Sequence, residues 1–207
     1  MKKLSLVLLL FAFVFSGCSA SRVTGSEGKT ASTDPKADVI AASRKFAALK
    51  SLTGKIEATG PAPFKQTVEY IAPDRYHVSY RDESGANSEM IMAADKAYVK
   101  SGDSWNEMAG NTKPTPTMRN SFTEDVLSTI SDVKFEGDAI LDGKPVLVYS
   151  YKLVTKVGSF AVMQRIWVDK TSGLPIKCYV EYTDGSIKTL TTSFDTDTPV
   201  KIELPAK

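Results

Sequence analysis

Residues 146–154 read VLVYSYKLV and give the strongest fold signal in this chain of 207 residues. Side chains alternate between the two faces of a β-strand. Here one face carries leucine and tyrosine, while the other still carries valine. Residues 160–168 repeat this pattern, with Met163 and Trp167 on the second face. A strand that is apolar on both faces has to be covered on both faces. The stretch predicts either a two-layer sandwich or a curled sheet around an apolar hollow.

The remainder of the chain predicts a large antiparallel sheet with few helices. About eleven stretches show the two-residue alternation that is typical of β-strands. Short polar turns between them, such as Asp184-Gly185, favour antiparallel pairing. A first helix should begin at Asp34-Pro35, an N-cap acceptor followed by proline, and end by about residues 52–54. A second should begin with the capping box at residues 121–124. Two helices cannot cover such a sheet on both faces.

The N-terminus has the order of a secretory signal. Lys2 and Lys3 precede an apolar run over residues 4–15, too short for the span of about 20 residues that crosses a membrane. Phe-Ser-Gly-Cys at residues 15–18 resembles the lipobox of bacterial lipoproteins, with Phe15 where leucine is usual. The resemblance implies that residues 1–17 are a signal peptide and that Cys18 carries acyl chains such as palmitate. The alternative is a secreted protein in which Cys18 is incidental.

Residues 18–35 predict a flexible linker after the anchor. Nine of the sixteen residues 19–34 are Ser, Thr or Gly, a composition that buries too little apolar surface to become ordered. We therefore expect a lipid-anchored protein of the cell envelope. By resemblance to Gram-negative lipoproteins, Ser19 in place of Asp favours the outer membrane, facing the periplasm. In another host, the outer face of the plasma membrane is expected.

Charge and cysteine content exclude other classes. The chain has 26 Lys and Arg against 24 Asp and Glu, and loss of Lys2 and Lys3 makes the two equal. No basic stripe stands out, which argues against a nucleic-acid partner. With Cys18 acylated, Cys178 has no partner for a disulfide. It alternates with Ile176 and Val180, which predicts a buried, unreactive thiol.

No catalytic constellation is visible in the sequence. His77 is the single histidine, so a nucleophile–histidine system would have to use it, and no cluster of metal ligands exists. His77 lies on the polar side of a predicted strand, and we expect it to be a solvated surface residue. Asp195 and Asp197 are expected to be solvated carboxylates at a strand end. The sequence predicts a protein that is not an enzyme and that uses neither metal nor cofactor.

Residues 36–207 resemble the lipoprotein-carrier and lipid-binding superfamily of LolA, LolB, RseB and the LppX/LprG lipoproteins. The matching segments, in order, are YIAPDRY at 70–76, ADKAYVK at 94–100 followed by Trp105, IWVD at 166–169, GLP at 173–175 and PVKIELP at 199–205. The resemblance implies one domain that is mainly β (α+β). Its large antiparallel sheet would be an open, curved half-barrel around an apolar cavity, with the N-terminal helix and a helix near 121–131 as a lid.

Apolar recognition is the chemistry that this fold and these residues favour. Methionine adapts its shape to a ligand, and aromatic residues with a polar tip suit the mouth of a cavity. The side chains expected to line the cavity are Val78, Tyr80, Met90, Met92, Leu147, Tyr149 and Ile166. The alternative for each is an ordinary core position.

The predicted function is that of a monomeric, membrane-anchored lipoprotein that binds a lipid, or the acyl chains of another lipoprotein, without catalysis. The alternative is an envelope sensor or regulator that uses the same fold to contact a protein partner.

Overall fold

A computed structural model describes residues 30–108, 122–154, 161–183 and 185–205. In these ranges eleven strands form one antiparallel sheet, in the order β6-β5-β4-β3-β2-β1-β11-β10-β9-β8-β7. The strands are β1 (Ser51–Thr59), β2 (Phe64–Ile71), β3 (Arg75–Asp82), β4 (Asn87–Ala93), β5 (Lys96–Ser101), β6 (Ser104–Glu107), β7 (Ser131–Leu141), β8 (Lys144–Val154), β9 (Ala161–Asp169), β10 (Pro175–Glu181) and β11 (Thr189–Asp195). The prediction of one large antiparallel sheet is confirmed, and the sandwich alternative is wrong.

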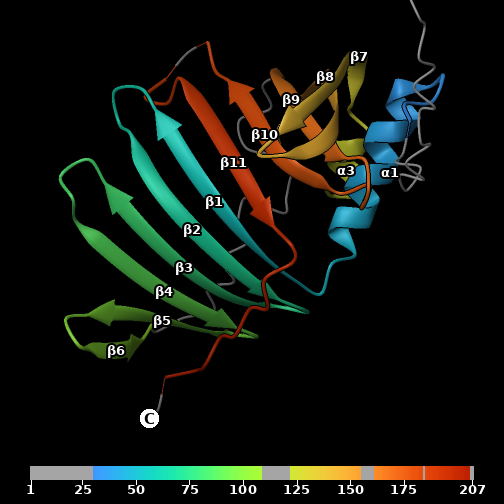
Figure 1. Cartoon of the computed structure of the whole chain (residues 1–207). Helices are drawn as coiled ribbons and strands as arrows, with labels where there is room; N and C mark the ends of the chain where they lie inside the picture. Colours follow the sequence, from blue (N-terminus) through green and yellow to red (C-terminus); the bar gives the residue numbers. More distant parts are fainter. Residues whose placement is uncertain (1–29, 109–121, 155–160, 184, 206–207) are drawn as a thin grey trace, which may run out of the picture.

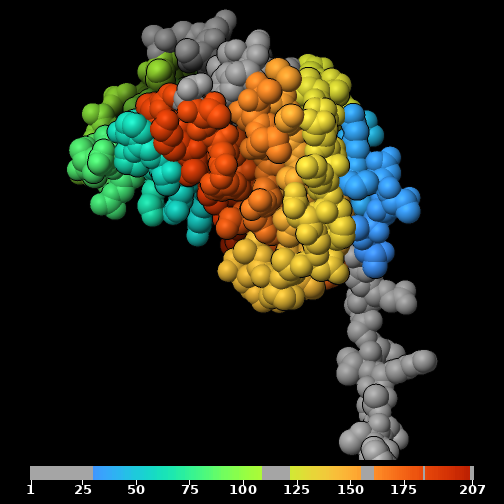
Figure 2. Space-filling view, turned by 90° about the horizontal axis from the view of Figure 1, so that it is seen from above, coloured from blue at the N-terminus to red at the C-terminus, as the bar shows by residue number. Residues whose placement is uncertain are grey.

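The two described helices, α1 (Pro35–Ala47) and α3 (Glu124–Leu127), lie on one side of the molecule. In Figure 1 they lie beside β7–β10, while β2–β6 fan away from them. Helix α1 packs on β7 and β10, and α3 packs on β8. Figure 2 shows β11 between β1 and β10, with α1 next to the β7–β8 end. Neither of these helices is long and apolar enough to cross a membrane.

Helix α1 begins as predicted but ends sooner. The Asp34 carboxylate accepts hydrogen bonds from the backbone N–H groups of Lys36 and Ala37, at 3.0 and 3.1 Å. Proline at the next position needs no such partner. The predicted end at residues 52–54 is wrong, because Leu52 belongs to β1 and alternates in burial with its strand neighbours. Its side chain reaches the core from the sheet, not from the helix.

Helix α3 is also shorter than predicted. Thr123 is its N-cap, and its side chain forms no capping hydrogen bond. Ser121, the first residue of the predicted capping box, lies outside the described residues. The helix ends at Leu127, and β7 already begins at Ser131, so the predicted helix of residues 121–131 is wrong beyond its first turn. One turn suffices here because Val126 and Leu127 are both buried.

The main core lies between the helices and one face of the sheet, which we call the inner face. The ring of Phe46 on α1 lies 4.4 Å from that of Phe122 and 4.6 Å from that of Phe194 on β11. Tyr149 on β8 donates a hydrogen bond to the Asp38 carboxylate of α1 at 2.9 Å. Burial and this bond raise the pKa of Tyr149 above its ordinary value. The phenol therefore stays a hydrogen-bond donor at every physiological pH.

Cys178 lies on β10 within this core. Its side chain is buried, and burial raises the pKa of the thiol to about 12. A thiol that stays protonated is a poor nucleophile. The prediction of a buried, unreactive thiol is confirmed.

Candidate ligand-binding face

The strand register shows which predicted cavity residues share a face. Directly paired residues of neighbouring strands lie on the same face of a sheet. One row runs from Met90 through Val78, Val68 and Gly54 to Phe194, a residue of the main core. Val78 and Met90 therefore belong to the inner face, and so do Tyr80 and Met92, two residues along their strands.

The remaining three predicted residues reach the same face from the other half of the sheet. Tyr149 pairs with Ile166, and Leu147 pairs with Val168. Ile166 then pairs with Cys178, which pairs with Thr192 on the inner face of β11. All seven predicted residues thus lie on one face, which alternation within single strands could not establish.

Burial divides the seven residues into two groups. Leu147, Tyr149 and Ile166 are fully buried in the main core beside α1 and α3. The other four lie on β3 and β4, in the part of the sheet that fans away from the described helices (Figure 1). There Tyr80 is 36% exposed, and Val78 and Met90 are half-buried, but Met92 is only 5% exposed. A ligand could therefore contact Val78, Tyr80 and Met90 directly, and the role of all seven residues in ligand binding stays a prediction.

We call β2–β6 the wing, and its inner face has a polar row and two apolar rows. Gln66, Tyr80 and Ser88 form the polar row across β2, β3 and β4. The apolar rows are Val68, Val78, Met90 and Val99, and next to it Tyr70, Tyr76, Met92 and Ala97. Such a surface is amphipathic along the strand direction.

Sequence reasoning missed several residues of this face, among them Phe64, Tyr76 and Val99. The Phe64 ring lies 5.4 Å from that of Tyr80, and the Tyr76 ring lies 5.0 Å from that of Tyr70. Tyr76 could have been found, because it alternates with Val78 and Tyr80 in the sequence. Phe64 and Val99 could not, since their membership depends on the pairing of β2 with β3 and of β4 with β5.

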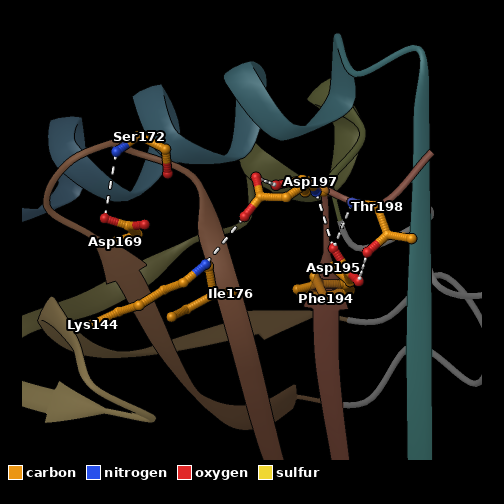
Figure 3. Close-up of a pocket in the computed structure, with 9 residues that line it drawn as sticks. Lys144, Asp169, Ser172, Ile176, Phe194, Asp195, Asp197 and Thr198 are labelled. Carbon is orange, nitrogen blue, oxygen red and sulfur yellow. Dashed lines mark hydrogen bonds and ion pairs between the residues drawn. The ribbon is translucent and has the colours of Figure 1, made fainter.

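A polar hollow of about 340 Å³ lies at the end of β11 (Figure 3). It is lined by Lys144, Asp169, Ser172, Ile176, Phe194, Asp195, Thr196, Asp197 and Thr198. Asp195 accepts hydrogen bonds from the Thr198 hydroxyl at 2.7 Å and from the N–H groups of Asp197 and Thr198. These bonds, the hydroxyl foremost, lower the pKa of Asp195. Both carboxylates are exposed as predicted, and Asp195 fixes the turn that follows β11.

A second hollow, of about 290 Å³, lies along β2, β3 and β4. Its lining residues are Lys65, Gln66, Thr67, Ser79, Tyr80, Arg81, Asn87, Ser88 and Glu89. Both hollows are thus lined mainly by polar side chains. The apolar residues of the wing form an extended face and do not line either hollow, apart from Tyr80.

His77 lies on the outer face of the wing, opposite the candidate face. The prediction of a solvated residue is wrong, because its side chain is 25% exposed and its Nδ1 lies 2.7 Å from a Glu69 oxygen. Its Nε2 lies 3.4 Å from Glu89, which accepts a hydrogen bond from Lys100 at 2.8 Å. Lys100 foremost, and His77 after it, lower the pKa of Glu89. In the described ranges no group of His, Cys, Asp and Glu is arranged to hold a metal ion.

Comparison with known proteins places the fold. No protein-family model matches the sequence, and no curated protein matches it. The Mycobacterium tuberculosis lipoprotein LppX superimposes with a TM-score of 0.64 at 17% identity, covering 82% of this chain and 98% of LppX. LprF from Mycobacterium bovis superimposes with a TM-score of 0.62 at 13% identity, covering 86% of this chain and 100% of LprF. The open eleven-stranded sheet and these two likenesses together show that the chain has the fold of LppX and LprF.

Proposed function

We propose that this protein is an envelope lipoprotein, tethered through acylated Cys18, that binds the acyl chains of a lipid or of another lipoprotein without catalysis. The observation that carries the proposal is the inner face of the wing. Its apolar rows continue the core face of the sheet beyond the part on which α1 and α3 pack. In the row that starts at Val68, the side chains of Val78, Met90 and Val99 are only half-buried. Partly exposed, contiguous apolar surface of this kind is typical of a binding site.

The chemistry of the rows fits an amphipathic ligand with a flexible apolar chain. Met90 and Met92 can adapt to chains of different length and shape. Each buried methylene contributes about 0.8 kcal/mol, so about twelve of them exceed 9 kcal/mol before the cost of immobilisation. Gln66, Tyr80 and Ser88 offer amide and hydroxyl groups in a row beside the apolar rows. A polar ligand head on that side would find hydrogen-bond partners.

Native mass spectrometry followed by solvent extraction tests the proposal directly. Residues 30–207 contain every residue of both core clusters, so this segment can be produced without the anchor. We expect a co-purifying mass in the lipid range, or uptake of a fluorescent fatty acid by the purified protein. A clean apo mass together with no fatty-acid uptake would overturn acyl-chain binding and favour a protein partner.

A matched pair of variants locates the ligand on the molecule. Met90→Glu places a carboxylate in an apolar row of the wing, and we expect it to weaken fatty-acid binding about tenfold or more. Met163→Glu makes the same change on the outer face, where the side chain is 45% exposed, and should leave affinity unchanged. Equal affinities for both variants, measured by fluorescence titration of folded protein, would exclude the wing as the site.

A further inference from the structure

The chain after β11 leaves the sheet and crosses to the outer face of the wing. In Figure 1 it runs from the end of β11 past β1–β4 toward the C-terminus. The turn at its start is fixed by Asp195 and by the ion pair of Asp197 with Lys144, at 3.2 Å (Figure 3). We call residues 199–204 the strap. The strap belongs to none of the described strand ladders.

Two side chains, Ile202 and Val200, and one backbone group attach the strap to the wing. Ile202 is 5% exposed and forms a second core cluster with Ile91 on β4 and Tyr98 on β5. The Arg75 guanidinium on β3 donates a hydrogen bond to the carbonyl oxygen of Ile202 at 3.2 Å. Ile71 on β2, Trp105 on β6 and Val200 pack around this cluster. The attachment therefore joins all five strands of the wing at one place.

The strap and the candidate ligand face share the same strands. Ile91 and Tyr98 pair directly on the outer face, while their sequence neighbours Met90, Met92 and Val99 lie on the inner face. The main core reaches β2 and β3 of the wing through Val68, Tyr70, Tyr76 and Val78. Farther out, among the described residues, the strap adds its contacts on Ile91 and Tyr98 to the ladders of β4 and β5. Because successive residues of a strand point to opposite faces, a change of strand twist under Ile202 also moves the apolar rows.

We propose that the strap is a releasable brace. Docked through Ile202, it holds the wing in one curvature, and detached, it lets β4 and β5 flex and so speeds ligand exchange on the inner face. The second part of this proposal rests on the proposed function. Residues 199, 201, 203 and 204 are all exposed, so few contacts have to break for the strap to detach.

Hydrogen exchange on residues 30–207 tests the brace independently of any ligand. Ile202→Asp removes the buried anchor, whereas Leu204→Asp makes the same change at a strap residue that is 44% exposed and outside the cluster. We expect amides of β4 and β5 to exchange about tenfold faster in Ile202→Asp only, with β8 unchanged in both variants. Equal exchange of β4 and β5 in the two variants would overturn the proposal.

A milder variant keeps the test interpretable if Ile202→Asp unfolds the whole protein. Arg75→Ala removes the hydrogen bond to the Ile202 carbonyl and leaves the buried side chain in place. It should speed exchange in β4 and β5 in the same direction by a smaller factor. If exchange of β8 also rises in Ile202→Asp, the result for Arg75→Ala tests the proposal instead. Unchanged amide exchange of β4 and β5 in Arg75→Ala would then contradict the brace.

The dissociation rate of a bound fluorescent fatty acid tests ligand exchange. We expect faster release from Ile202→Asp and an unchanged rate from Leu204→Asp. If the fatty acid dissociates from every variant at the same rate although β4 and β5 exchange faster in Ile202→Asp, the strap does not control ligand exchange. If no variant and no parent protein binds the probe while the wing still loosens, the brace stands and the proposed function fails.

Discussion

Gly60 lies where the turn between β1 and β2 meets the loop between β10 and β11. Its φ of +130° is a conformation that side-chain-bearing residues rarely adopt. A Cβ atom here would lie 2.7 Å from the carbonyl oxygen of Ser186 and 2.8 Å from the backbone nitrogen of Lys188. The Ser186 oxygen also accepts a hydrogen bond from the N–H of Ala62 at 3.0 Å. A single hydrogen atom at position 60 thus allows two loops to meet.

Replacing Gly60 with alanine should therefore destabilise the protein. Gly60→Ala adds a backbone clash to an unfavourable φ, and we expect the free energy of unfolding to fall by about 2 kcal/mol or more. Gly102 also has a positive φ, of +59°, but nothing lies within 4 Å of its added Cβ. Gly102→Ala should cost about 1 kcal/mol. Equal losses in urea denaturation would show that the clash at residue 60 relaxes.

Glu89 makes stability depend on pH. Lys100 and His77 lower its pKa in the folded protein, so its ionised form stabilises the fold above the unfolded pKa of about 4.3. This contribution is lost as the pH falls through the lower, folded pKa. We expect Glu89→Gln to reduce stability near pH 7 by about 1 kcal/mol, with the difference from the parent shrinking as the pH falls below about 4.3. Glu57→Gln, at an exposed pair with Lys65, should change little in the same denaturation series.

Alternation within a strand could predict whether a single side chain is buried, but not which residues of other strands lie next to it. The buried state of Cys178 follows from its own strand, because Ile176 and Val180 share its periodicity. The neighbours of His77 come instead from β2 and β4, and the pairing of these strands with β3 fixes them. Turn chemistry likewise could not predict that Gly60 faces a loop more than a hundred residues away.

Among the elements, α1 shows which contacts hold a helix to this sheet. Arg44 forms a two-pronged ion pair with Glu124 of α3 at 2.8 and 2.9 Å, but the two side chains are 61% and 66% exposed. Solvent screens such a pair. Phe46 is fully buried between Phe122 and Phe194, and it therefore removes far more apolar surface from water than the Arg44–Glu124 pair does.

Two substitutions separate these contributions. Phe46→Ala should lower the free energy of unfolding by about 3–5 kcal/mol, because it leaves a cavity in the main core. Glu124→Gln should lower it by less than about 1 kcal/mol. Chemical denaturation of both variants measures the difference, and a loss for Glu124→Gln as large as that for Phe46→Ala would contradict this account of α1.

Helix boundaries were predictable only where local chemistry sets them. Asp34 and Pro35 determine the start of α1 through a capping carboxylate and a missing N–H. The end was not predictable, because Leu52 satisfies an apolar period of three or four as well as a period of two. Pairing of β1 with both β2 and β11 decides in favour of the strand.

For the whole molecule, the sequence indicated a single open sheet as one of two alternatives. The stretch at residues 146–154 required cover on both faces but could not distinguish a second sheet from curvature. The family resemblance favoured curvature, and the strand order confirms one sheet. Placement of the helices beside β7–β10, and of the strap behind the wing, depends on contacts between distant segments, which no local pattern contains.

The proposed tether is also a property of the whole chain. We expect the full chain in a bacterial host to incorporate a clickable palmitate analogue and to fractionate with membranes. Cys18→Ser should abolish labelling, because the acylated thiol is gone, while Cys178→Ser should leave labelling unchanged. Label that persists in Cys18→Ser would contradict lipidation at this residue, and unlabelled parent protein in the soluble fraction would favour simple secretion.

The pairing of β1 with β11 has a consequence for biogenesis. Thr53 pairs with Asp195, so the middle of the sheet joins segments from opposite ends of the domain, whereas the arms β1–β6 and β7–β11 are built from consecutive hairpins. Contacts so distant along the chain form slowly. During export the first arm would emerge from the translocation channel well before its partner, and the sheet would stay in two pieces until β11 arrives. Under the proposed export, completion of the fold would therefore be coupled to completion of secretion.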